Sequence, residues 1–250
     1  MTTAMILAAG RGERMRPLSD SCPKPLLSVG GKALIEWQIE RLVAAGFDRL
    51  VINCSHLGAM LQERLGGGER YGAHIRYSQE AEPLEAAGGI ATALPLLDPG
   101  VVLVVSGDIY TDYNFATLHE RIAALSQSNG PGADCAHLVM VPNPAYHAVG
   151  DFALRDERLA LSGPDRFTFG NIGLYRTSEF AELPRARKLK ILPLYQRWIR
   201  SGRASGELFT GTWANVGTPD ELSALDRGLS AHSPPAPPFL NAHALHESER

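Results

Sequence analysis

Residues 4–17 read AMILAAGRGERMRP and place a glycine-rich, arginine-rich loop directly after a short apolar run. A basic turn, Pro23-Lys24-Pro25, follows soon after it. Gly10 and Gly12 lack the Cβ atoms that would keep backbone amides away from phosphate oxygens. Four cations bring positive charge into the same small volume: Arg11, Arg14, Arg16 and Lys24. The segment therefore predicts a binding site for a triphosphate.

This loop differs from two commoner phosphate-binding motifs. A P-loop needs Gly-x-x-x-x-Gly-Lys-Ser/Thr, which the chain does not contain, and the dinucleotide fingerprint needs a third glycine where Glu13-Arg14-Met15 stands. Glycines with arginines after a strand also suit an ordinary solvated turn, and the glycine pair alone does not decide between the two. The prolines beside Lys24 favour the phosphate site, because they stiffen the backbone that carries this cation.

Short β-branched runs alternate with helical patterns along the chain, which is typical of βαβ units on a mainly parallel sheet. We expect strands at 4–8, 50–52, 75–77 and 101–105, and helices at 33–43, 57–65 and 90–97, the last of them opened by Gly88 and Gly89. The run at 101–105 is continuously apolar, as in a strand that helices cover on both faces. The predicted fold is therefore α/β: a Rossmann-like, three-layer structure with a mainly parallel sheet and helices on both faces.

The composition narrows the class of ligand. The chain has 250 residues, 44% of them hydrophobic, which suffices for one large core. A net charge of -3 gives no field that would attract nucleic acid or an anionic membrane, so the basic loop serves a small anionic ligand. No apolar run reaches the roughly 18 residues of a membrane span, and the N-terminus does not resemble a signal peptide. Three widely spaced cysteines argue against a disulfide framework or a zinc site, and we expect a cytoplasmic protein.

Two segments are expected to lie outside the packed core. Residues 230–250 are rich in proline, alanine and histidine and lack apolar periodicity, which predicts a disordered tail after one domain at 1–229. Residues 126–133, SQSNGPGA, predict a flexible surface loop between a helix and a strand.

Later motifs extend the pattern of the opening loop. They are EAEPLEAAGGI at 80–90, SGD at 106–108, GD at 150–151 and WANVGT at 213–218. Together with LAAGRGERMRPL at 7–18 and PKPL at 23–26, they resemble in order and spacing the signature of the sugar-1-phosphate nucleotidylyltransferases, over about residues 4–228. Within this family the sequence resembles the branch that acts on N-acetylmuramate α-1-phosphate. The resemblance implies transfer of a uridylyl group from UTP to this sugar-1-phosphate in cell-wall recycling, with release of pyrophosphate and with Mg²⁺ as cofactor.

The predicted metal site centres on Asp108. This residue follows the buried strand at 101–105, at the carboxyl end where ligands bind in such sheets, and a carboxylate there suits Mg²⁺ held against phosphate oxygens. A turn or cap is the alternative role for such an aspartate. The family's usual second ligand is an aspartate in Trp-x-Asp-x-Gly-Thr, whereas the matching residue here is the uncharged Asn215, so we expect weaker binding of the free metal. Asp112 is a candidate supplementary ligand.

The resemblance also assigns contacts with the nucleotide. Glu80 matches a residue that meets the edge of a pyrimidine, where a carboxylate accepts the N3-H of uracil and disfavours cytosine, while the backbone near Glu85 donates to uracil O4. From the residues alone, these acids also fit a solvated charged run. The expected nucleotide-binding residues are Leu7, Ala8, Ala9, Gly10, Gly12, Glu80, Glu85 and Gly107.

Arg14 and Lys24 are the expected catalytic cations. A phosphate oxygen of the sugar attacks the α-phosphorus and pyrophosphate leaves in line, so the protein positions and neutralises rather than forming a covalent bond. Arg14 is expected to act on the α- and β-phosphates, and Lys24 on the α-phosphate or the incoming phosphate. Segments that match the sugar-phosphate site of relatives supply further candidates, each of which also fits a turn or surface role: Asn143, Gly150, Asp151, Asn171 and Lys190.

Two alternatives stay open. The first is a uridylyl-, thymidylyl- or guanylyltransferase that acts on glucose-1-phosphate or mannose-1-phosphate, because the loop and Asp108 do not define the sugar. The second is a non-catalytic protein that binds nucleotide sugars, which Asn215 in place of the usual aspartate keeps open. The chain shows no added dimerisation segment, and we expect a monomer.

Overall fold

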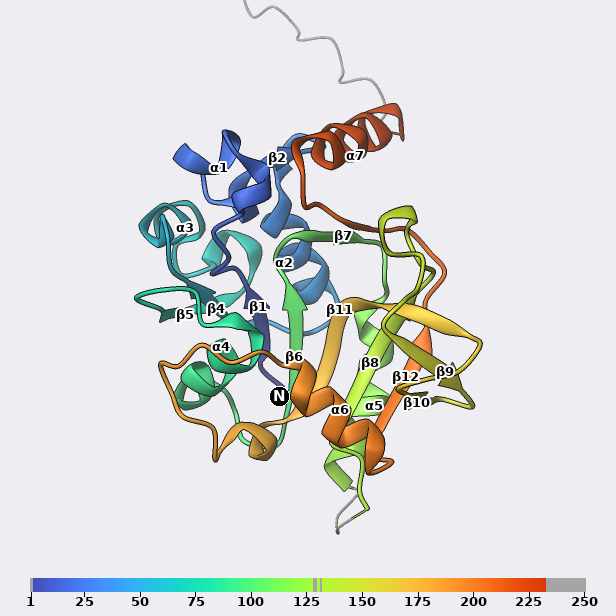
Figure 1. The fold of residues 1–250 in the computed structure, drawn as a ribbon. Helices are drawn as coiled ribbons and strands as arrows, with labels where there is room; N and C mark the ends of the chain where they lie inside the picture. Colours follow the sequence, from blue (N-terminus) through green and yellow to red (C-terminus); the bar gives the residue numbers. More distant parts are fainter. Residues whose placement is uncertain (1, 128–129, 131, 233–250) are drawn as a thin grey trace, which may run out of the picture.

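The computed structural model describes residues 2–127, 130 and 132–232, and its centre is a nine-stranded sheet between two layers of helices (Figure 1). The strands lie in the order β5-β4-β1-β6-β11-β8-β12-β10-β9. Their bounds are β1 (Ala4–Leu7), β4 (Arg49–Cys54), β5 (His74–Gln79), β6 (Val101–Ser106), β8 (Ala136–Val141), β9 (Phe152–Arg155), β10 (Arg158–Ala160), β11 (Arg166–Arg176) and β12 (Ala204–Leu208).

The two halves of this sheet differ in strand direction. Strands β5, β4, β1 and β6 run parallel to one another, and they correspond to the four strands that the sequence predicts. Strand β11 runs antiparallel to both β6 and β8, and β10 runs antiparallel to β9 and β12, while β12 is parallel to β8. Only Asp156 and Glu157 separate β9 from β10, which is too short for a parallel crossover. The sheet is therefore mixed rather than mainly parallel.

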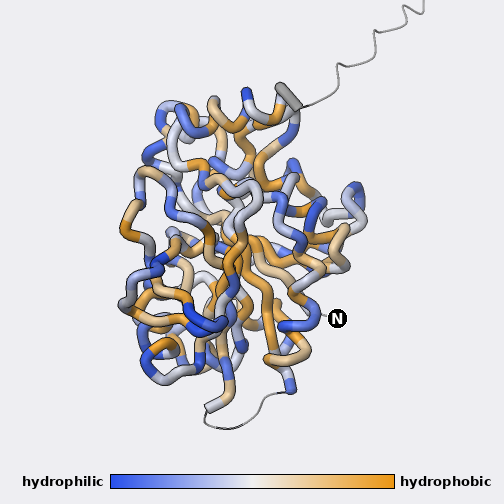
Figure 2. The backbone as a smooth tube through the Cα atoms, turned by 90° about the vertical axis from the view of Figure 1, so that its right-hand side faces the viewer, coloured by the Kyte–Doolittle hydropathy of each residue, from blue (hydrophilic) through white to orange (hydrophobic). Residues whose placement is uncertain are grey.

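Helices cover both faces of the sheet, as the sequence predicts. The helices α2 (Leu34–Ala44), α3 (Gly58–Leu65) and α5 (Leu118–Gln127) pack on one face, and α4 (Glu85–Ala93) and α6 (Leu192–Arg200) pack on the other. In β1, Ala4 and Ile6 point to the first layer and Met5 to the second. This burial on both faces explains the continuous apolar runs, which Figure 2 shows as hydrophobic strands through the middle of the molecule.

A smaller cluster connects the C-terminal helix α7 (Pro219–His232) to the N-terminal segment (Figure 1). Met15, from the segment after the glycine loop, is fully buried there. Leu222 and Leu225 of α7 pack against this cluster. The elements near it are α1 (Leu18–Ser21), the β2–β3 hairpin (Ser28–Val29 and Lys32–Ala33), and β7 (Ile109–Thr111) paired with β13 (Trp213–Asn215). The cluster therefore holds the segment that follows the glycine loop against helix α7.

The structure corrects the predicted helix at 90–97. Helix α4 begins at Glu85 and ends at Ala93, and Leu94–Leu96 form a 3-10 helix. Gly88 and Gly89 lie inside α4 and do not open it. They are small because their neighbours come close: a Cβ on Gly88 would lie 2.1 Å from the carbonyl oxygen of Arg187, and one on Gly89 would lie 2.8 Å from Nδ2 of Asn53.

The two predicted flexible segments are described only in part. The loop predicted at 126–133 begins with the last two residues of α5, and residues 128, 129 and 131 lie outside the described residues. Helix α7 continues to His232, so residues 230–232 of the predicted tail are helical, and 233–250 lie outside the described residues. Among the helices of the described chain, none combines the length and apolarity that crossing a membrane requires.

The close approach at Gly88 can be tested with Gly88→Ala. The new methyl group would meet backbone, which cannot move aside as a flexible side chain can, so α4 or residues 184–190 must shift. We expect the free energy of unfolding to fall by about 1–3 kcal/mol in urea titrations. Gly228→Ala in α7 is the matched control: apart from its own helix backbone and chain neighbours, no atom of the described residues lies within 4 Å of its new Cβ, and alanine favours a helix by about 1 kcal/mol. A Gly88→Ala protein as stable as the wild type would contradict the contact.

Candidate active site

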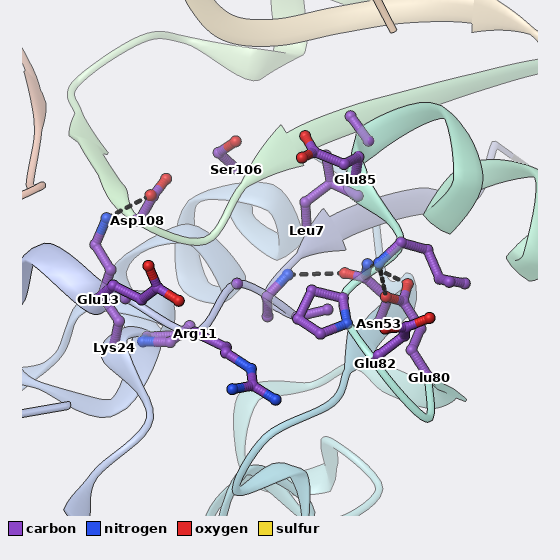
Figure 3. Close-up of a pocket in the computed structure, with 18 of the residues that line it drawn as sticks. Leu7, Arg11, Glu13, Lys24, Asn53, Glu80, Glu82, Glu85, Ser106 and Asp108 are labelled. Carbon is purple, nitrogen blue, oxygen red and sulfur yellow. Dashed lines mark hydrogen bonds and ion pairs between the residues drawn. The ribbon is translucent and has the colours of Figure 1, made fainter. Parts of the chain in front are cut away.

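A cleft of about 850 Å³ opens at the carboxyl ends of four neighbouring parallel strands (Figure 3). Residues at or next to these strand ends line it: Leu7 after β1, Asn53 in β4, Glu80 after β5 and Ser106 in β6. Ligands of α/β sheets bind at such an edge, because the loops that follow the strands converge there.

The glycine loop forms one wall of this cleft. Most of the residues predicted for it line the cleft: Leu7, Ala8, Ala9, Gly10, Arg11, Gly12 and Arg14. Gly12 has φ +64°, a left-handed conformation that favours glycine, and its carbonyl oxygen accepts a hydrogen bond from Ser19 Oγ at 2.8 Å. Arg14 packs against Gly217, with Nη2 3.0 Å from the point where a Cβ would be. Arg16 instead pairs with Asp20 at 3.1 Å and is not among the lining residues, so it does not add its charge to the cleft.

Lys24 and Asp108 form an ion pair within the cleft. Nζ lies 2.5 Å from Oδ2, and the Lys24 side chain is only 9% exposed, against 33% for Asp108. Lys24 opens a 3-10 helix (Lys24–Leu26) directly after Pro23, and Asp108 is the second residue after β6. The neighbouring Gly107 does not line the cleft. Its amide donates to the carbonyl oxygen of Leu7 at 2.9 Å, so this glycine packs against β1 instead of facing a ligand.

At the end of the cleft away from Lys24 and Asp108, a series of hydrogen bonds connects the ends of neighbouring strands. The backbone amide of Ala8 donates to Asn53 Oδ1 at 2.8 Å, and Asn53 Nδ2 donates to Glu80 Oε1 at 2.7 Å. The second oxygen of Glu80 accepts from the backbone amide of Leu84 at 2.9 Å. Figure 3 shows these contacts at the opposite end of the cleft from Lys24 and Asp108. These hydrogen bonds fix the ends of β1, β4 and β5 and the start of α4 relative to one another.

Glu80 is buried, with 3% of its surface exposed. Burial raises the pKa of its carboxyl above the ordinary value, and the hydrogen bonds from Asn53 and Leu84 oppose this increase. Both carboxylate oxygens therefore already have a donor, although a carboxylate can accept about four hydrogen bonds. Glu85 also lines the cleft, and its φ of +60° turns the backbone at the first residue of α4.

A second cavity, of about 350 Å³, lies where β11, β13 and α6 meet, and it contains the predicted residues Asp151, Asn171 and Asn215. Asp151 Oδ2 accepts from the backbone amide of Phe169 at 2.8 Å. Asn171 has φ +58° and lies at the register shift in β11, an irregularity that re-aims a side chain out of the strand pattern. Aromatic rings complete the lining: Phe152, Phe169, Tyr195 and Trp213. The cavity thus combines polar side chains with rings, as sugar sites do.

The other three residues predicted for the sugar line neither cavity. Asn143 Nδ2 donates to the carbonyl oxygens of Ala148 and Arg166, and its Oδ1 accepts from Thr168 Oγ1 at 2.9 Å, so its amide supports the loop. Gly150 has φ +67°, and a Cβ there would lie 2.7 Å from Asn143 Oδ1. Lys190 is exposed.

Asn215 carries a buried oxygen that suits a metal. It pairs with Ile109 across β13 and β7, and the next amide, that of Val216, donates to the carbonyl oxygen of Asp108 at 2.9 Å. Among the described residues, Asn215 Oδ1 has no hydrogen-bond partner. An unpaired amide oxygen is a ligand that Mg²⁺ accepts, together with carboxylates, phosphate oxygens and waters. The Asn215 side chain lines the second cavity and Asp108 lines the cleft, and the contacts that join the two segments are backbone contacts. No group of three or more histidine, cysteine or acidic side chains is arranged for a metal in the described part of the chain.

The predicted supplementary ligand, Asp112, has a different position. Its Oδ1 accepts from the backbone amide of Thr212 at 2.8 Å, and it lines neither cavity. Sequence reasoning also missed several lining residues, among them Asn53 and Lys188. Asn53 gave one signal, since it is a polar residue at the end of an apolar run. Lys188 lines the cleft, and its only signal was the basic run at 185–190.

Similarity to known proteins agrees with this arrangement. A family model described as nucleotidyl transferase matches residues 3–141. The chain is 45% identical to an N-acetylmuramate alpha-1-phosphate uridylyltransferase of Neisseria meningitidis serogroup B, over 86% of the chain and 93% of that protein. It is 30% identical to a protein of the same name from Caulobacter vibrioides, over 91% of the chain and 96% of that protein.

Solved structures share the fold. A Bacillus anthracis protein assigned as a glucose-1-phosphate thymidylyltransferase superposes with a TM-score of 0.79 at 18% identity, over 92% of the chain and 95% of that structure. HddC from Yersinia pseudotuberculosis, complexed with GMP-PN, gives a TM-score of 0.71 at 18% identity, over 91% and 99%. At this identity the likeness is one of architecture.

Glu80→Gln tests the hydrogen-bond chain. Glutamine offers one acceptor and one donor where two donors converge, so one hydrogen bond is lost in a buried place. We expect a free energy of unfolding lower by about 1–3 kcal/mol, measured by urea titration. Burial raises the pKa of Glu80, so the wild type becomes more stable as the pH falls and this carboxyl is protonated, whereas glutamine does not titrate. The difference in free energy of unfolding between the wild type and Glu80→Gln should therefore be larger near about pH 5 than near about pH 8.

Glu82→Gln is the matched control, since Glu82 lines the same cleft but is exposed. We expect a change within about 0.5 kcal/mol for it. Equal stability of the two variants would show that the hydrogen bonds of Glu80 do not stabilise the fold.

Proposed function

Because the chain belongs to the nucleotidyl transferase family, we propose that it transfers a uridylyl group from UTP to N-acetylmuramate α-1-phosphate and releases pyrophosphate. The observation that carries this proposal is the cleft itself, which has the Lys24–Asp108 pair and the glycine loop at one end and the Asn53–Glu80 contact at the other (Figure 3). The 45% identity over 86% of the chain supports the choice of nucleotide and sugar.

In the proposed complex, the base lies at the Glu80 end and the triphosphate lies on the glycine loop. Glu80 Oε atoms have lone pairs left to accept uracil N3-H, and the backbone at Glu85 turns toward the base with its positive φ. Gly10 and Gly12 leave the loop amides open to phosphate oxygens. This orientation brings the α-phosphate toward Lys24.

The proposed reaction needs no protein nucleophile. A phosphate oxygen of the sugar-1-phosphate forms a bond to the α-phosphorus, the bond from the α-phosphorus to the bridging oxygen breaks, and pyrophosphate leaves with that electron pair. Lys24 neutralises charge at the α-phosphate, and Arg14 neutralises the charge that develops on the leaving group. The protein contributes position and charge, and the buried pair with Asp108 holds the Lys24 amine in place.

We assign Asp108 and Asn215 as the residues that would hold Mg²⁺. When bound, Mg²⁺ neutralises phosphate charge beyond what the two cations supply. The unpaired Oδ1 of Asn215 supports its part in this assignment. The second cavity would hold the sugar, with Asp151 and Asn171 as hydroxyl partners and with Asn143 and Gly150 shaping the loop behind it. A contact from Lys190 would require its exposed side chain to bend toward the sugar.

The proposal extends to the oligomeric state, the domain bounds and the location of the protein. We propose that the protein acts as a monomer. We also propose one catalytic domain over residues 1–229 and a cytoplasmic protein, since UTP is a cytoplasmic substrate.

Incubation with UTP, Mg²⁺ and a panel of sugar-1-phosphates tests this function, with pyrophosphate release as the readout. We expect release with N-acetylmuramate α-1-phosphate and little with glucose-1-phosphate or mannose-1-phosphate. Release only with one of the other sugars would replace the proposed substrate. No release with any sugar, together with tight binding of UDP-sugars, would support a binding protein instead.

Arg14→Ala tests the assignment of the leaving-group cation. We expect kcat to fall by about 10²–10³, as for the loss of one donor that stabilises a transition state, with a smaller effect on the KM for UTP. Arg16→Ala removes a neighbouring cation that pairs with Asp20 outside the cleft, and its kinetics should match the wild type. Unchanged turnover in Arg14→Ala would contradict the assignment.

Asn215→Asp tests the metal ligand. A carboxylate in place of the amide adds charge at the buried oxygen, so the UTP complex should bind Mg²⁺ about tenfold more tightly, a gain of about 1.4 kcal/mol. Isothermal titration of the UTP-bound protein measures this directly. Asn114→Asp is the control, because Asn114 is an exposed helix cap. Equal Mg²⁺ affinity in wild type and Asn215→Asp would exclude Asn215 as a ligand.

A further inference from the structure

The segment at 184–190, PRARKLK, carries an unusual concentration of positive charge. Four of its residues are cations, and each is exposed: Arg185, Arg187, Lys188 and Lys190. None of the four takes part in an ion pair within the described part of the chain. Like charges so close together repel one another, and an anionic ligand would relieve this repulsion.

The backbone of this segment is fixed against helix α4. The amide of Leu189 donates to the carbonyl oxygen of Leu84 at 2.9 Å, and the amide of Gly88 donates to the carbonyl oxygen of Leu189 at 3.2 Å. The amide of Ala186 donates to Thr92 Oγ1 at 3.0 Å. Figure 1 shows the segment before α6 running beside α4. These bonds hold Lys188, which is next to Leu189, at the edge of the cleft that it lines.

The segment connects the two cavities along the chain, since one of its residues lines the cleft and the helix that follows it lines the second cavity. Lys188 lines the cleft together with Glu85 and Ala86, and the chain then enters α6, whose Leu192 and Tyr195 line the second cavity. A sugar that extends from the α-phosphate into the second cavity therefore passes this segment. The phosphates have other cations, Arg14 and Lys24, at the glycine loop. The charge of Lys188 is thus available for an anionic group on the sugar.

We propose that Lys188 binds the lactyl carboxylate of N-acetylmuramate α-1-phosphate and so selects this sugar over those that lack a carboxylate. This inference rests on the proposed function. N-acetylglucosamine 1-phosphate is the same sugar without the lactyl ether, so the carboxylate is the charged group that distinguishes the two. An ammonium group donates charge-assisted hydrogen bonds to a carboxylate, which are stronger than neutral ones. The other three cations add to the attraction without a direct contact.

A cycle of one substitution and one change in the substrate tests the proposal. The protein variant is Lys188→Gln, and the altered substrate is the carboxamide of N-acetylmuramate α-1-phosphate, which keeps the shape of the lactyl group but not its charge. In the wild type, the carboxamide should raise the KM for the sugar about tenfold. Lys188→Gln should raise the KM for the acid about tenfold. In this variant, the KM for the carboxamide should exceed the KM for the acid by less than about twofold. The KM for UTP should not change.

Arg185→Gln is the matched control, because Arg185 is an exposed cation of the same segment that lines neither cavity. It should keep the preference of the wild type for the acid. If Lys188→Gln raises the KM for acid and carboxamide equally, or raises the KM for UTP, the cation serves the phosphates and the proposal is overturned. Equal use of acid and carboxamide by the wild type also overturns it and leaves the proposed function intact. If N-acetylmuramate α-1-phosphate is no substrate at all, both fail.

Discussion

The arrangement of the cleft depends on the ion pair between Lys24 and Asp108. An amine that is only 9% exposed loses most of its hydration, and a carboxylate 2.5 Å away compensates for this loss. Removing one member of such a pair typically costs about 3–5 kcal/mol, because the other charge stays buried and alone. The pair joins segments 84 residues apart and so holds the basic turn against the end of β6. The glycine loop lies between these two anchors.

The hydrogen bonds from Ala8 through Asn53 to Glu80 hold segments together at the other end of the cleft, as the ion pair does at the first end. Both oxygens of Glu80 and both ends of the Asn53 amide take part in these hydrogen bonds, which leaves little freedom in the wall of the site. Charges and dipoles that are fixed before the substrate arrives need no reorganisation during the reaction, and this is the main way in which a protein can speed phosphoryl transfer. The same rigidity explains why glycine occurs at position 89, where a Cβ would collide with Asn53 and Glu80.

The parts of the site that could be predicted from sequence are those that depend on neighbours in the chain. Gly10 and Gly12 follow a strand directly, and Asp108 ends an apolar run, so their places in the cleft followed from local patterns. The β9–β10 hairpin, one of the antiparallel parts of the sheet, could not be predicted, because its two-residue turn has positive φ at Asp156 and Glu157 but contains no glycine.

Long-range contacts decide the remaining positions. Whether Gly88 opens a helix or packs inside one depends on Arg187, which lies far along the chain. For the same reason, sequence reasoning chose the exposed Lys190 and missed Lys188, whose place at the cleft depends on hydrogen bonds between Leu189 and α4. Asn143 was expected to be a ligand because its segment matches the sugar-phosphate site of relatives, yet its hydrogen bonds go to Arg166 and Thr168.

The central claim is that the α-phosphoryl group of UTP moves to the phosphate of an N-acetylmuramate derivative. UTP labelled at the α-phosphorus, incubated with the protein, Mg²⁺ and N-acetylmuramate α-1-phosphate, tests this most directly, with the products separated and their label counted. The account predicts all transferred label in UDP-N-acetylmuramate and an equal amount of unlabelled pyrophosphate. Label in free UMP, or in no product that contains the sugar, would contradict it.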